Sequence, residues 1–292
     1  MLEHVVPFLI CPYCGDPLTR TDRALRCESG HAFDIARQGY VSLLPTAWRG
    51  DAGDTAAMVQ ARERFLAAGH FAVISTTLAD LAERATADAS GCVVDVGAGV
   101  GNYLATVLDR TPELVGVALD VSKYALRRAA RAHQRVGAVA CDVWHGLPVA
   151  DDAAAVVLNV FAPRNATELA RILHPSGRLL VVTPTARHLH ELVSELHLVE
   201  VDEQKPQRLT AQLSPCFELV DHRAVDATMT LSYEDVEAVV AMGPSAWHTD
   251  ADEIGRRVRQ LQEPISVTLS VTIGVYAPLG WSDPPRTRLA GT

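Results

Sequence analysis

The sequence predicts an α/β protein in which a small metal-binding module precedes a doubly wound, mostly parallel β-sheet. Three observations support this prediction. Unbroken apolar runs alternate with helical stretches through the middle of the chain, the first run ends in a glycine-rich loop, and three cysteines and a histidine gather within the first 31 residues. Apolar runs without polar alternation are typical of strands buried on both faces, as in a parallel sheet between two layers of helices.

The composition is that of a globular protein. The chain has 292 residues, of which 48% are apolar and 21% charged, and this apolar content is well above that of disordered chains. No apolar run approaches the roughly 18 residues that a membrane helix needs, and the N-terminus lacks the basic region of a secretory signal. We therefore expect a cytoplasmic protein without a membrane partner. The net charge of −9 argues against a uniformly basic nucleic-acid binder but allows one basic face.

The N-terminal region has the spacing of a zinc site. Cys11, Cys14, Cys27 and His31 follow the pattern C-x2-C-x12-C-x3-H, in which two pairs of ligands close a tetrahedron around zinc. Disulfides are one alternative, but a cytoplasmic chain disfavours them and three cysteines leave one unpaired. Free structural thiols are a second alternative. Because protein ligands fill all four positions, the predicted zinc ion is structural and not catalytic.

The remaining elements follow in order along the chain. A polar, glycine-containing segment at 46–56 is predicted to link a module at 1–45 to a domain at 57–292. The tail of that domain holds two β-rich stretches, which we expect to complete the sheet as an antiparallel pair. The predicted strands cover 92–96, 114–120, 137–142, 153–160, 178–183, 215–231 and 265–278, and the predicted helices cover 122–135, 164–173, 233–242, 251–262 and a stretch that begins at Asn102.

The glycine-rich loop and the acids at three strand ends indicate the ligand. The loop runs from Asp95 through Gly97 and Gly99, and it places asparagine where a dinucleotide fingerprint has glycine or alanine. An acid this close to the loop would repel a pyrophosphate but suits a ligand with an ammonium group, such as S-adenosylmethionine. Asp120 can accept the ribose hydroxyls, and Asp142 can accept the adenine amino group. The alternative for each acid is a helix N-cap or a solvated loop end.

Together these features resemble the family of 23S rRNA (guanine-N1)-methyltransferases that modify hairpin 35. The resemblance extends over most of the chain and includes the four predicted zinc ligands. A zinc ribbon ahead of such a methyltransferase domain is more specific than either part alone. The further characteristic blocks are His31–Asp34, Gln38–Pro45, Gly53–His70, Ala162-Pro163, Pro184 with Arg187–Leu189, and Met242–Trp247.

The resemblance implies a class I S-adenosylmethionine-dependent methyltransferase with a Rossmann-like sheet and an N-terminal zinc ribbon. It implies cofactor contacts at Phe71, Gly99, Val100 and His188, although Phe71 could belong to the core and His188 could cap a helix. The implied substrate is hairpin 35 of 23S rRNA, with guanine 748 favoured over guanine 745. The resemblance further suggests a homodimer and, for actinobacterial members, resistance to macrolides of the tylosin or mycinamicin type.

Methylation of guanine N1 makes specific demands on a site. N1 carries a proton at neutral pH, so the site must position the base and either accept that proton or stabilise charge on O6. Asn159 ends the fourth strand beside the glycine loop and is predicted to position the substrate. Phe161 is predicted to stack on an extruded guanine. An ordinary hydrogen bond at the strand end is the alternative for Asn159.

The zinc module is also the predicted RNA grip. Arg20, Arg23, Arg26 and Arg37 lie there among aromatic residues, and this combination can hold phosphates and stack on loop bases. The sequence alone leaves two other functions open. One is a small-molecule methyltransferase with a structural zinc module, and the other is a catalytically inactive zinc protein that binds RNA. Cofactor binding without methyl transfer to any RNA would favour these alternatives.

Overall fold

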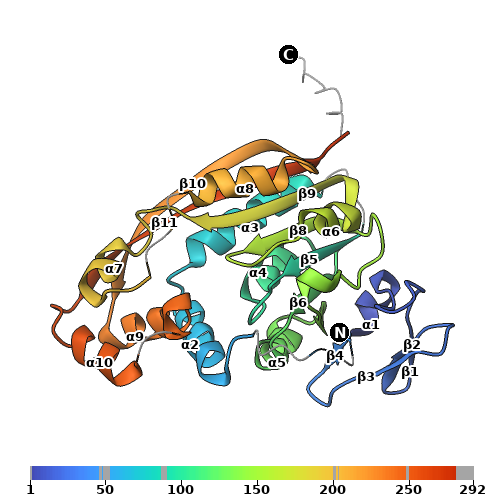
Figure 1. The fold of residues 1–292 in the computed structure, drawn as a ribbon, viewed down its shortest axis with the longest axis horizontal. Helices are drawn as coiled ribbons and strands as arrows, with labels where there is room; N and C mark the ends of the chain where they lie inside the picture. The colour runs from blue at the N-terminus through green and yellow to red at the C-terminus, as the bar shows by residue number, and fades with distance from the viewer. Residues whose placement is uncertain are drawn as a thin grey trace.

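The computed structural model describes residues 2–45, 48, 53–86, 91–199, 202, 204–247 and 250–280. Residues 46–47 and 49–52 of the predicted linker, and 281–292 of the predicted domain, lie outside the described residues. The chain begins with a short helix, α1 (Leu2–Val5), and a 3-10 turn, η1 (Val6–Phe8). A small antiparallel sheet follows at one end of the molecule (Figure 1), with strands β1 (Thr19–Thr21), β2 (Ala24–Arg26) and β3 (Ala32–Asp34).

In the described part of the chain, the main sheet has eight strands in the order β10-β11-β9-β8-β5-β6-β7-β4. The strands from β9 to β4 are parallel, and β10 and β11 form the expected antiparallel pair at one edge. The predicted strands are confirmed with shifts of one or two residues at most ends, whereas β9 begins at Leu173, five residues before its predicted start. The bounds are β4 (Tyr40–Ser42), β5 (Cys92–Val96), β6 (Gly116–Asp120), β7 (Val136–Ala140), β8 (Ala154–Val160), β9 (Leu173–Pro184), β10 (Phe217–Leu231) and β11 (Ile265–Pro278).

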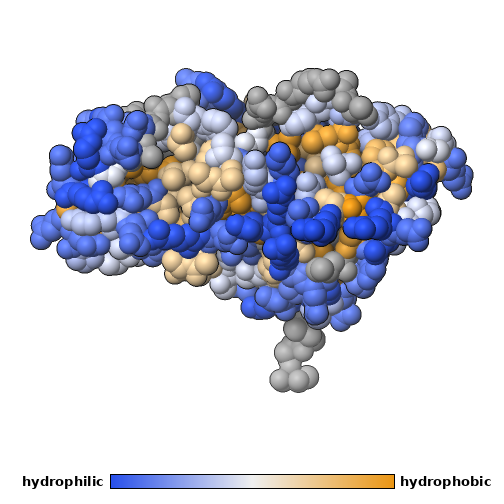
Figure 2. Space-filling model, turned by 90° about the horizontal axis from the view of Figure 1, so that it is seen from below, coloured by the Kyte–Doolittle hydropathy of each residue, from blue (hydrophilic) through white to orange (hydrophobic). Residues whose placement is uncertain are grey.

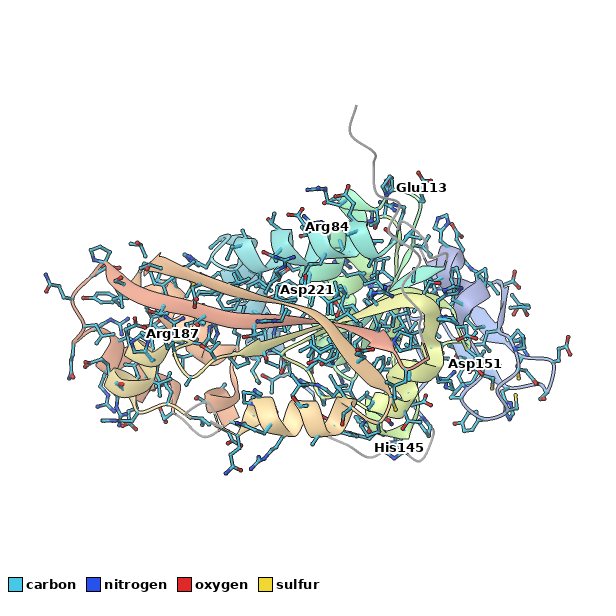
Figure 3. All side chains as sticks on the ribbon, turned by 90° about the horizontal axis from the view of Figure 1, so that it is seen from above. Arg84, Glu113, His145, Asp151, Arg187 and Asp221 are labelled. Carbon is cyan, nitrogen blue, oxygen red and sulfur yellow. The ribbon has the colours of Figure 1, made fainter. Side chains whose placement is uncertain are left out.

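Helices cover both faces of this sheet, as the unbroken apolar runs predict. Every residue of β5, β7 and β8 is buried, and neighbouring residues of β5 belong to the two separate cores on opposite faces. One core includes α2 (Ala56–Ala67), α3 (Ala72–Ala85), α4 (Asn102–Arg110), α5 (Lys123–Ala132), α7 (His190–Leu196), α9 (Tyr233–Ala241) and α10 (Ala251–Val258); the other includes α1, α6 (Ala166–Ile172) and α8 (Lys205–Leu213). Figure 3 shows α3 and α8 on opposite sides of the sheet.

The long strands β10 and β11 carry a second group of helices past the end of the parallel strands. In Figure 1, α7, α9 and α10 lie toward the end of the molecule to which β8 and β9 point. A 3-10 turn, η3 (Pro244–Trp247), follows α9. The carboxyl ends of the parallel strands, where ligands bind in open α/β sheets, are therefore bordered by residues from the C-terminal half of the chain.

The N-terminal module is built into the main sheet. Strand β4 lies within the predicted 1–45 module, yet it pairs in parallel with β7 and forms the edge of the eight-stranded sheet. Val5 of α1 is fully buried, and a Cβ added to Gly137 of β7 would lie 2.1 Å from its Cγ2 atom. A short strand of three residues has little apolar signal of its own, which explains why the sequence does not reveal this pairing.

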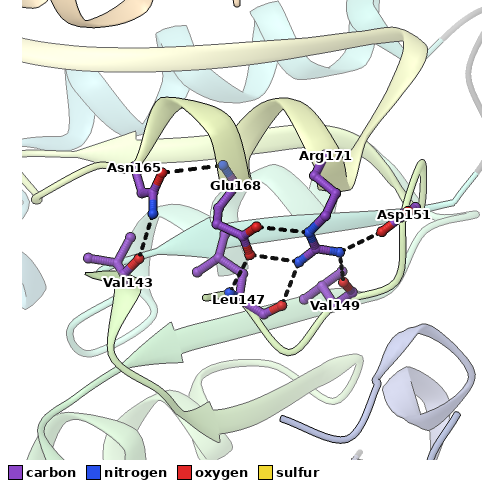
Figure 4. Close-up of polar contacts among 7 residues, drawn as sticks. All are labelled: Val143, Leu147, Val149, Asp151, Asn165, Glu168 and Arg171. Atoms are coloured by element: carbon purple, nitrogen blue, oxygen red, sulfur yellow. Dashed lines mark hydrogen bonds and ion pairs between the residues drawn. The ribbon is translucent and has the colours of Figure 1, made fainter. Parts of the chain in front are cut away.

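Arg171 of α6 holds the segment that follows β7. Its guanidinium donates hydrogen bonds to the carbonyl oxygens of Leu147 and Val149, each at 2.7 Å, and binds the carboxylates of Asp151 and Glu168 (Figure 4). The side chain therefore ties the loop after the 3-10 turn η2 (Val143–His145) to a helix on the sheet. This anchoring also holds η2, at the beginning of the segment, beside the site described below.

One face of the molecule can be judged from its hydropathy. Figure 2 shows hydrophilic side chains over most of the face seen from below, with hydrophobic residues set back between them. Among the described residues, no single helix is long and apolar enough to cross a membrane, and only α2 and α3, bent by 79°, reach that length together.

Candidate active site and metal centre

The four predicted zinc ligands come together in the N-terminal module. The imidazole Nδ1 of His31 lies 3.5 Å from the Cys11 Sγ, 3.6 Å from the Cys14 Sγ and 3.3 Å from the Cys27 Sγ. The Sγ atoms of Cys14 and Cys27 are 3.6 Å apart, and all four ligand atoms lie within 4.8 Å of one another. Bond lengths of about 2.3 Å to sulfur and about 2.0 Å to nitrogen place the corners of a tetrahedral zinc site at such separations. The donor set therefore fits zinc.

Glycines shape the two turns that present these ligands. Gly15, which follows the first cysteine pair, has φ +75°, and Gly30, just before His31, has φ +87°. Residues with a side chain rarely adopt this left-handed conformation. Tyr13 packs on the imidazole at 5.0 Å between ring centroids and holds its orientation. These two glycines therefore allow the turns that bring the ligands together.

A cavity of about 290 Å³ lies at the carboxyl ends of β5, β6 and β7. The glycine-rich loop forms one wall, with Gly97 at φ +79° and Gly99 at φ +55°. A Cβ on Gly97 would lie 2.4 Å from the Cβ of Ala162, so only glycine fits there. The structure thus places the predicted glycines, Asp120 and Asp142 around one cavity, with Val100 in the adjoining part of its wall.

Asp95 lies directly beneath this loop and is 1% exposed. Neither of its carboxylate oxygens has a hydrogen-bond partner among the described residues. Burial, and to a lesser extent the nearby Asp120, raises the pKa of Asp95 to about 8. A buried carboxylate without a partner is costly, and an incoming ammonium group would satisfy it. This orphaned acid fits the amino group of S-adenosylmethionine.

Asp120 holds the glycine loop in place. Its Oδ2 accepts the backbone N–H of Gly99 at 2.8 Å, and its Oδ1 accepts that of Ser122 at 2.8 Å. Each carboxylate oxygen has a second lone pair, so both hydrogen bonds leave capacity for the predicted ribose hydroxyls. Burial raises the pKa of Asp120, although these two hydrogen bonds oppose the shift.

Asp142 caps a helical turn, which was the alternative to a contact with the adenine amino group. It caps η2, where its carboxylate accepts the backbone N–H of Trp144 at 3.0 Å. The same carboxylate binds Trp48 Nε1 at 3.2 Å and His145 Nδ1 at 3.0 Å. Asp142 also lines the cavity, so capping does not withdraw it from the ligand. Trp48 and Trp144 had not been singled out in the sequence.

Three predicted residues form an aromatic cluster beside this cavity. The ring centroids of Phe71, Phe161 and His188 are 5.8–6.3 Å apart, and Phe161 stacks on His188 with an interplanar angle of 22°. Phe71 is buried, whereas Phe161 is 38% exposed and has φ +52°, a strained conformation for a residue with a side chain. Such strain is common at functional sites, and here it presents the Phe161 ring at the cavity wall.

His188 is neutral and has a defined tautomer. Its Nδ1 accepts the backbone N–H of Ser270 at 3.2 Å, so the ring proton lies on Nε2. Burial, together with the positive charge of Lys205, lowers the pKa of His188 to about 4. At neutral pH the side chain therefore offers a hydrogen-bond donor and carries no charge.

Asn159, predicted to position the substrate, is not among the residues that line the cavities described here. It is fully buried, donates to the carbonyl oxygens of Val96 and Pro163, and accepts the Nε–H of Arg164 at 3.0 Å. These contacts match the alternative, a hydrogen bond at the strand end. A strand end predicts nearness to the site but not the direction of the side chain.

A larger cleft of about 720 Å³ adjoins the cofactor cavity. Phe71, Phe161 and His188 form one wall, and residues from α2, α7, α8 and α9 form the others. Arg62 borders both spaces and was missed in the sequence. It binds the Asp54 carboxylate at 2.6 Å and the carbonyl oxygen of Met242 at 2.8 Å. Nothing local in the sequence signals a contact between residues so far apart.

Lys205 is a second residue of the cleft that the sequence did not reveal. It begins α8 and is half-buried in the wall of the cleft. Of the predicted RNA-binding arginines in the zinc module, Arg23, Arg26 and Arg37 are exposed, whereas Arg20 is paired with Glu3 at 2.7 Å.

The fold, the glycine loop above a buried acid and the four-ligand metal centre define an S-adenosylmethionine-dependent methyltransferase with an N-terminal zinc ribbon. Comparisons with known families agree. Residues 9–49 match the zinc-ribbon model described as RlmA, N-terminal, and residues 94–181 match a methyltransferase domain. A chain of the solved Haloferax volcanii complex that contains the Trm112 methyltransferase activator is 18% identical, with a TM-score of 0.50, and covers 75% of this chain and 96% of that one.

Relatives of the whole chain are more specific. The 23S rRNA (guanine(748)-N(1))-methyltransferase of Streptomyces fradiae is 51% identical over 282 residues, which cover 96% of this chain and 100% of the relative. A relative from Micromonospora griseorubida is 51% identical over 296 residues, with the same coverage of both chains. The chain therefore belongs to the family of 23S rRNA (guanine-N1)-methyltransferases.

Proposed function

We propose that the protein methylates N1 of guanine 748 in hairpin 35 of 23S rRNA. The observation that carries this proposal is the 51% identity, over the full length of the relative, to the Streptomyces fradiae enzyme named for guanine 748. The same identity covers the zinc module and the C-terminal helices that border the cleft. Guanine 745 is the alternative position that the experiment below distinguishes.

The geometry supports transfer to a base. Phe161 borders both the cofactor cavity and the adjoining cleft, so a guanine stacked on its ring would meet the cofactor at the junction of the two spaces. S-adenosylmethionine supplies an electrophilic methyl group on its sulfonium when bound. The orphaned carboxylate of Asp95 would hold its ammonium group, and Asp120 its ribose. The cleft, of about 720 Å³, is large enough for a nucleotide, and residues of α7, α8 and η3 contribute to its lining.

The zinc module supplies the proposed RNA grip. Arg23, Arg26 and Arg37 are exposed there, and Tyr13 is 48% exposed and stacked on Phe33. Exposed guanidinium groups bind phosphates, and exposed rings stack on unpaired bases. If Arg23 and Arg26 are both changed to alanine, we expect weaker binding of the hairpin and normal cofactor affinity. An unchanged RNA affinity and methylation rate would show that the module does not bind the RNA.

Primer extension tests the proposal directly. The zinc-loaded protein is incubated with labelled S-adenosylmethionine and an unmodified hairpin-35 RNA, because an N1 methyl group blocks base pairing and stops the polymerase. We expect a stop at guanine 748 and no stop when that guanine is replaced by adenine. A stop at guanine 745 would instead identify that guanine as the methylated base. A protein that binds the cofactor but labels no RNA would contradict the proposal and favour a small-molecule substrate or an inactive RNA-binding protein.

Three further properties are proposed with this function. Methylation would confer resistance to macrolides of the tylosin or mycinamicin type, which expression in a sensitive strain tests through the inhibitory drug concentration. The protein would act in the cytoplasm, where its rRNA substrate is made. It would form a homodimer, and light scattering at micromolar concentration distinguishes a mass of twice the 31.4 kDa chain from the monomer.

A further inference from the structure

Methylation of guanine N1 requires a group that accepts the N1 proton, and this inference rests on the proposed function. The described lining of the cleft contains four side chains that could accept a proton: Asp54, His188, Asp202 and Lys205. Their partners differ, and these partners decide which of them can act as a base.

The two carboxylates are already engaged by arginines. Asp54 binds the Arg62 guanidinium at 2.6 Å, and Asp202 binds that of Arg208 at 2.7 Å. A carboxylate paired with a guanidinium is a weak base, because protonation would break the ion pair. Neither group is therefore suited to take a proton from a nitrogen as weakly acidic as guanine N1.

His188 has no free ring nitrogen that could accept a proton. Its Nδ1 lone pair accepts the backbone N–H of Ser270, and its Nε2 carries the proton. The side chain can therefore donate a hydrogen bond but cannot accept a proton at the cleft without losing its bond to β11. Its low pKa agrees with a group that stays neutral throughout the physiological range.

Lys205 differs from the other three because, among the described residues, no side chain or carbonyl group binds its amine. No carboxylate of the described chain lies within ion-pair distance of its Nζ, although the side chain is half-buried. The backbone carbonyl of Arg164 accepts a hydrogen bond from Gln212 at 2.8 Å, which docks α8 against the loop that carries Phe161. Lys205 lines the same cleft as Phe71, Phe161 and His188.

The charged groups around Lys205 favour its neutral form. Burial, and then the positive charge of Arg164, lowers the pKa of Lys205, and only Asp202 opposes this shift. Asp202 is itself bound to Arg208, and across the cleft Asp54 is bound to Arg62. His188 faces Lys205 as a neutral ring. Partial burial and a neighbouring cation both increase the fraction of a lysine amine that is neutral and able to accept a proton.

We propose that Lys205 is the general base that accepts the N1 proton of the target guanine. The N1–H bond breaks as its proton passes to the neutral Nζ, which becomes an ammonium group. The N1 electron pair forms the new bond to the methyl carbon while the carbon–sulfur bond breaks. The electrons of the broken bond stay on the sulfur, which becomes a neutral thioether. The proton on Lys205 passes to solvent after the product leaves. His188, which also lines the cleft and carries its proton on Nε2, can donate a hydrogen bond to the guanine.

Single-turnover methylation of the hairpin by saturating holoenzyme tests this role. Lys205→Met removes the amine, and Lys205→Arg keeps the positive charge but cannot accept a proton at working pH. A general base contributes typically 10²- to 10⁴-fold, so we expect both variants to lose about 100-fold or more in rate. Cofactor and RNA affinities should change by no more than about threefold. Lys123→Met, at the only other lysine of the sequence, is the matched control and should keep the wild-type rate.

The pH profile separates a base from a fixed charge. Because the neutral amine is the active form, the wild-type rate should rise with pH and level off below the ordinary lysine pKa. Lys205→Met should lose this inflection. In Lys205→Ala, free ethylamine should restore part of the rate in its unprotonated form.

Other outcomes are equally informative. A Lys205→Arg variant as fast as the wild type, with weak RNA binding only in Lys205→Met, would overturn the proposal and assign Lys205 to a phosphate. Full activity of Lys205→Met would also overturn it. A wild-type protein that labels no hairpin would instead contradict the proposed function, so the two failures are distinguishable.

Discussion

Burying an ionised carboxylate away from hydrogen-bond donors costs free energy, and Asp95 lies beneath the glycine loop without such a donor among the described residues. All residues of β5, which carries Asp95, are buried between the two layers of helices. The proposed partner of Asp95 at this position is the ammonium group of the ligand. Affinity for the ligand and stability of the empty protein are therefore opposed at this residue.

Asp95→Asn should make the empty protein more stable. The folded-state pKa of about 8 lies above the ordinary value of 3.8, so the folded chain keeps a proton that the unfolded chain releases between these values. The free energy of unfolding therefore falls as pH rises from about 4 to about 8, and asparagine removes this loss. We expect a higher melting temperature than wild type at pH 8 and a difference that shrinks toward pH 4, as measured by scanning fluorimetry.

The same substitution should lower the affinity for the cofactor. An uncharged amide loses the attraction to the ammonium group, and we expect at least a tenfold higher Kd for S-adenosylhomocysteine, equivalent to about 1.4 kcal/mol. Isothermal titration calorimetry measures this value. Equal affinity in the two proteins would remove Asp95 from the cofactor site.

Phe161 offers a second test at the residue scale. Stacking of a base on an aromatic ring contributes about 1–3 kcal/mol, so Phe161→Ala should lower kcat/KM for the hairpin about tenfold or more. Phe161→Tyr keeps the ring and should keep most of the activity. Steady-state methylation at varied RNA concentration provides the measurement. If the alanine and tyrosine variants are equally active, the ring does not stack on the substrate.

At the scale of elements, the metal-binding module and the sheet are linked by β4 and α1. β4 continues from the module directly into the edge of the main sheet beside β7, and the two elements bury Val5 and Val41 completely. Loss of order in the module would expose this apolar surface and unpair the edge of the sheet. Zinc therefore stabilises more than the three small strands around it.

Removal of zinc should destabilise the whole protein. Cys27→Ser, or extraction of the metal with a strong chelator, should lower the melting temperature of the main cooperative transition and not merely release the module. The holoprotein should contain one zinc ion per chain by elemental analysis. A variant whose main transition and cofactor affinity match the wild type would show that the module folds independently of the sheet.

At the scale of the whole molecule, the site is assembled from segments that are far apart in the chain. Arg62 joins Asp54 to Met242, and the aromatic cluster combines residues from before β5, after β8 and after β9. Each segment is positioned by a different part of the sheet. The catalytic geometry therefore depends on the packing of the complete fold, including contacts remote from the cavities.

Gly137→Ala tests such a remote contact. The new Cβ would lie 2.1 Å from Val5 Cγ2, and overpacking of this kind typically costs about 1–3 kcal/mol. We expect a lower free energy of unfolding by urea, partly restored when Val5→Ala is added. Gly243→Ala is the control, because its Cβ would meet its nearest neighbour at 3.5 Å. Additive effects of the two changes at positions 5 and 137 would contradict a direct contact.

The sequence by itself determined the zinc ligands, the glycine loop and the alternation of strands and helices. Cys11 and Cys14, like Gly97 and Gly99, are close in the chain, and local spacing is sufficient to predict their geometry. The apolar run of β5 likewise reports burial on both faces. These properties depend on neighbours a few residues away, and patterns of residue type record such neighbours.

Only the tertiary structure decided which polar side chains are free to act. Asn159 was expected in the site but is bonded to Arg164 within the protein, whereas Lys205 was not expected and stands in the wall of the cleft. The pairing of β4 with β7 was equally invisible. The physical reason is that partners, burial and charge environment arise from segments brought together by folding, and residue type at one position does not record them.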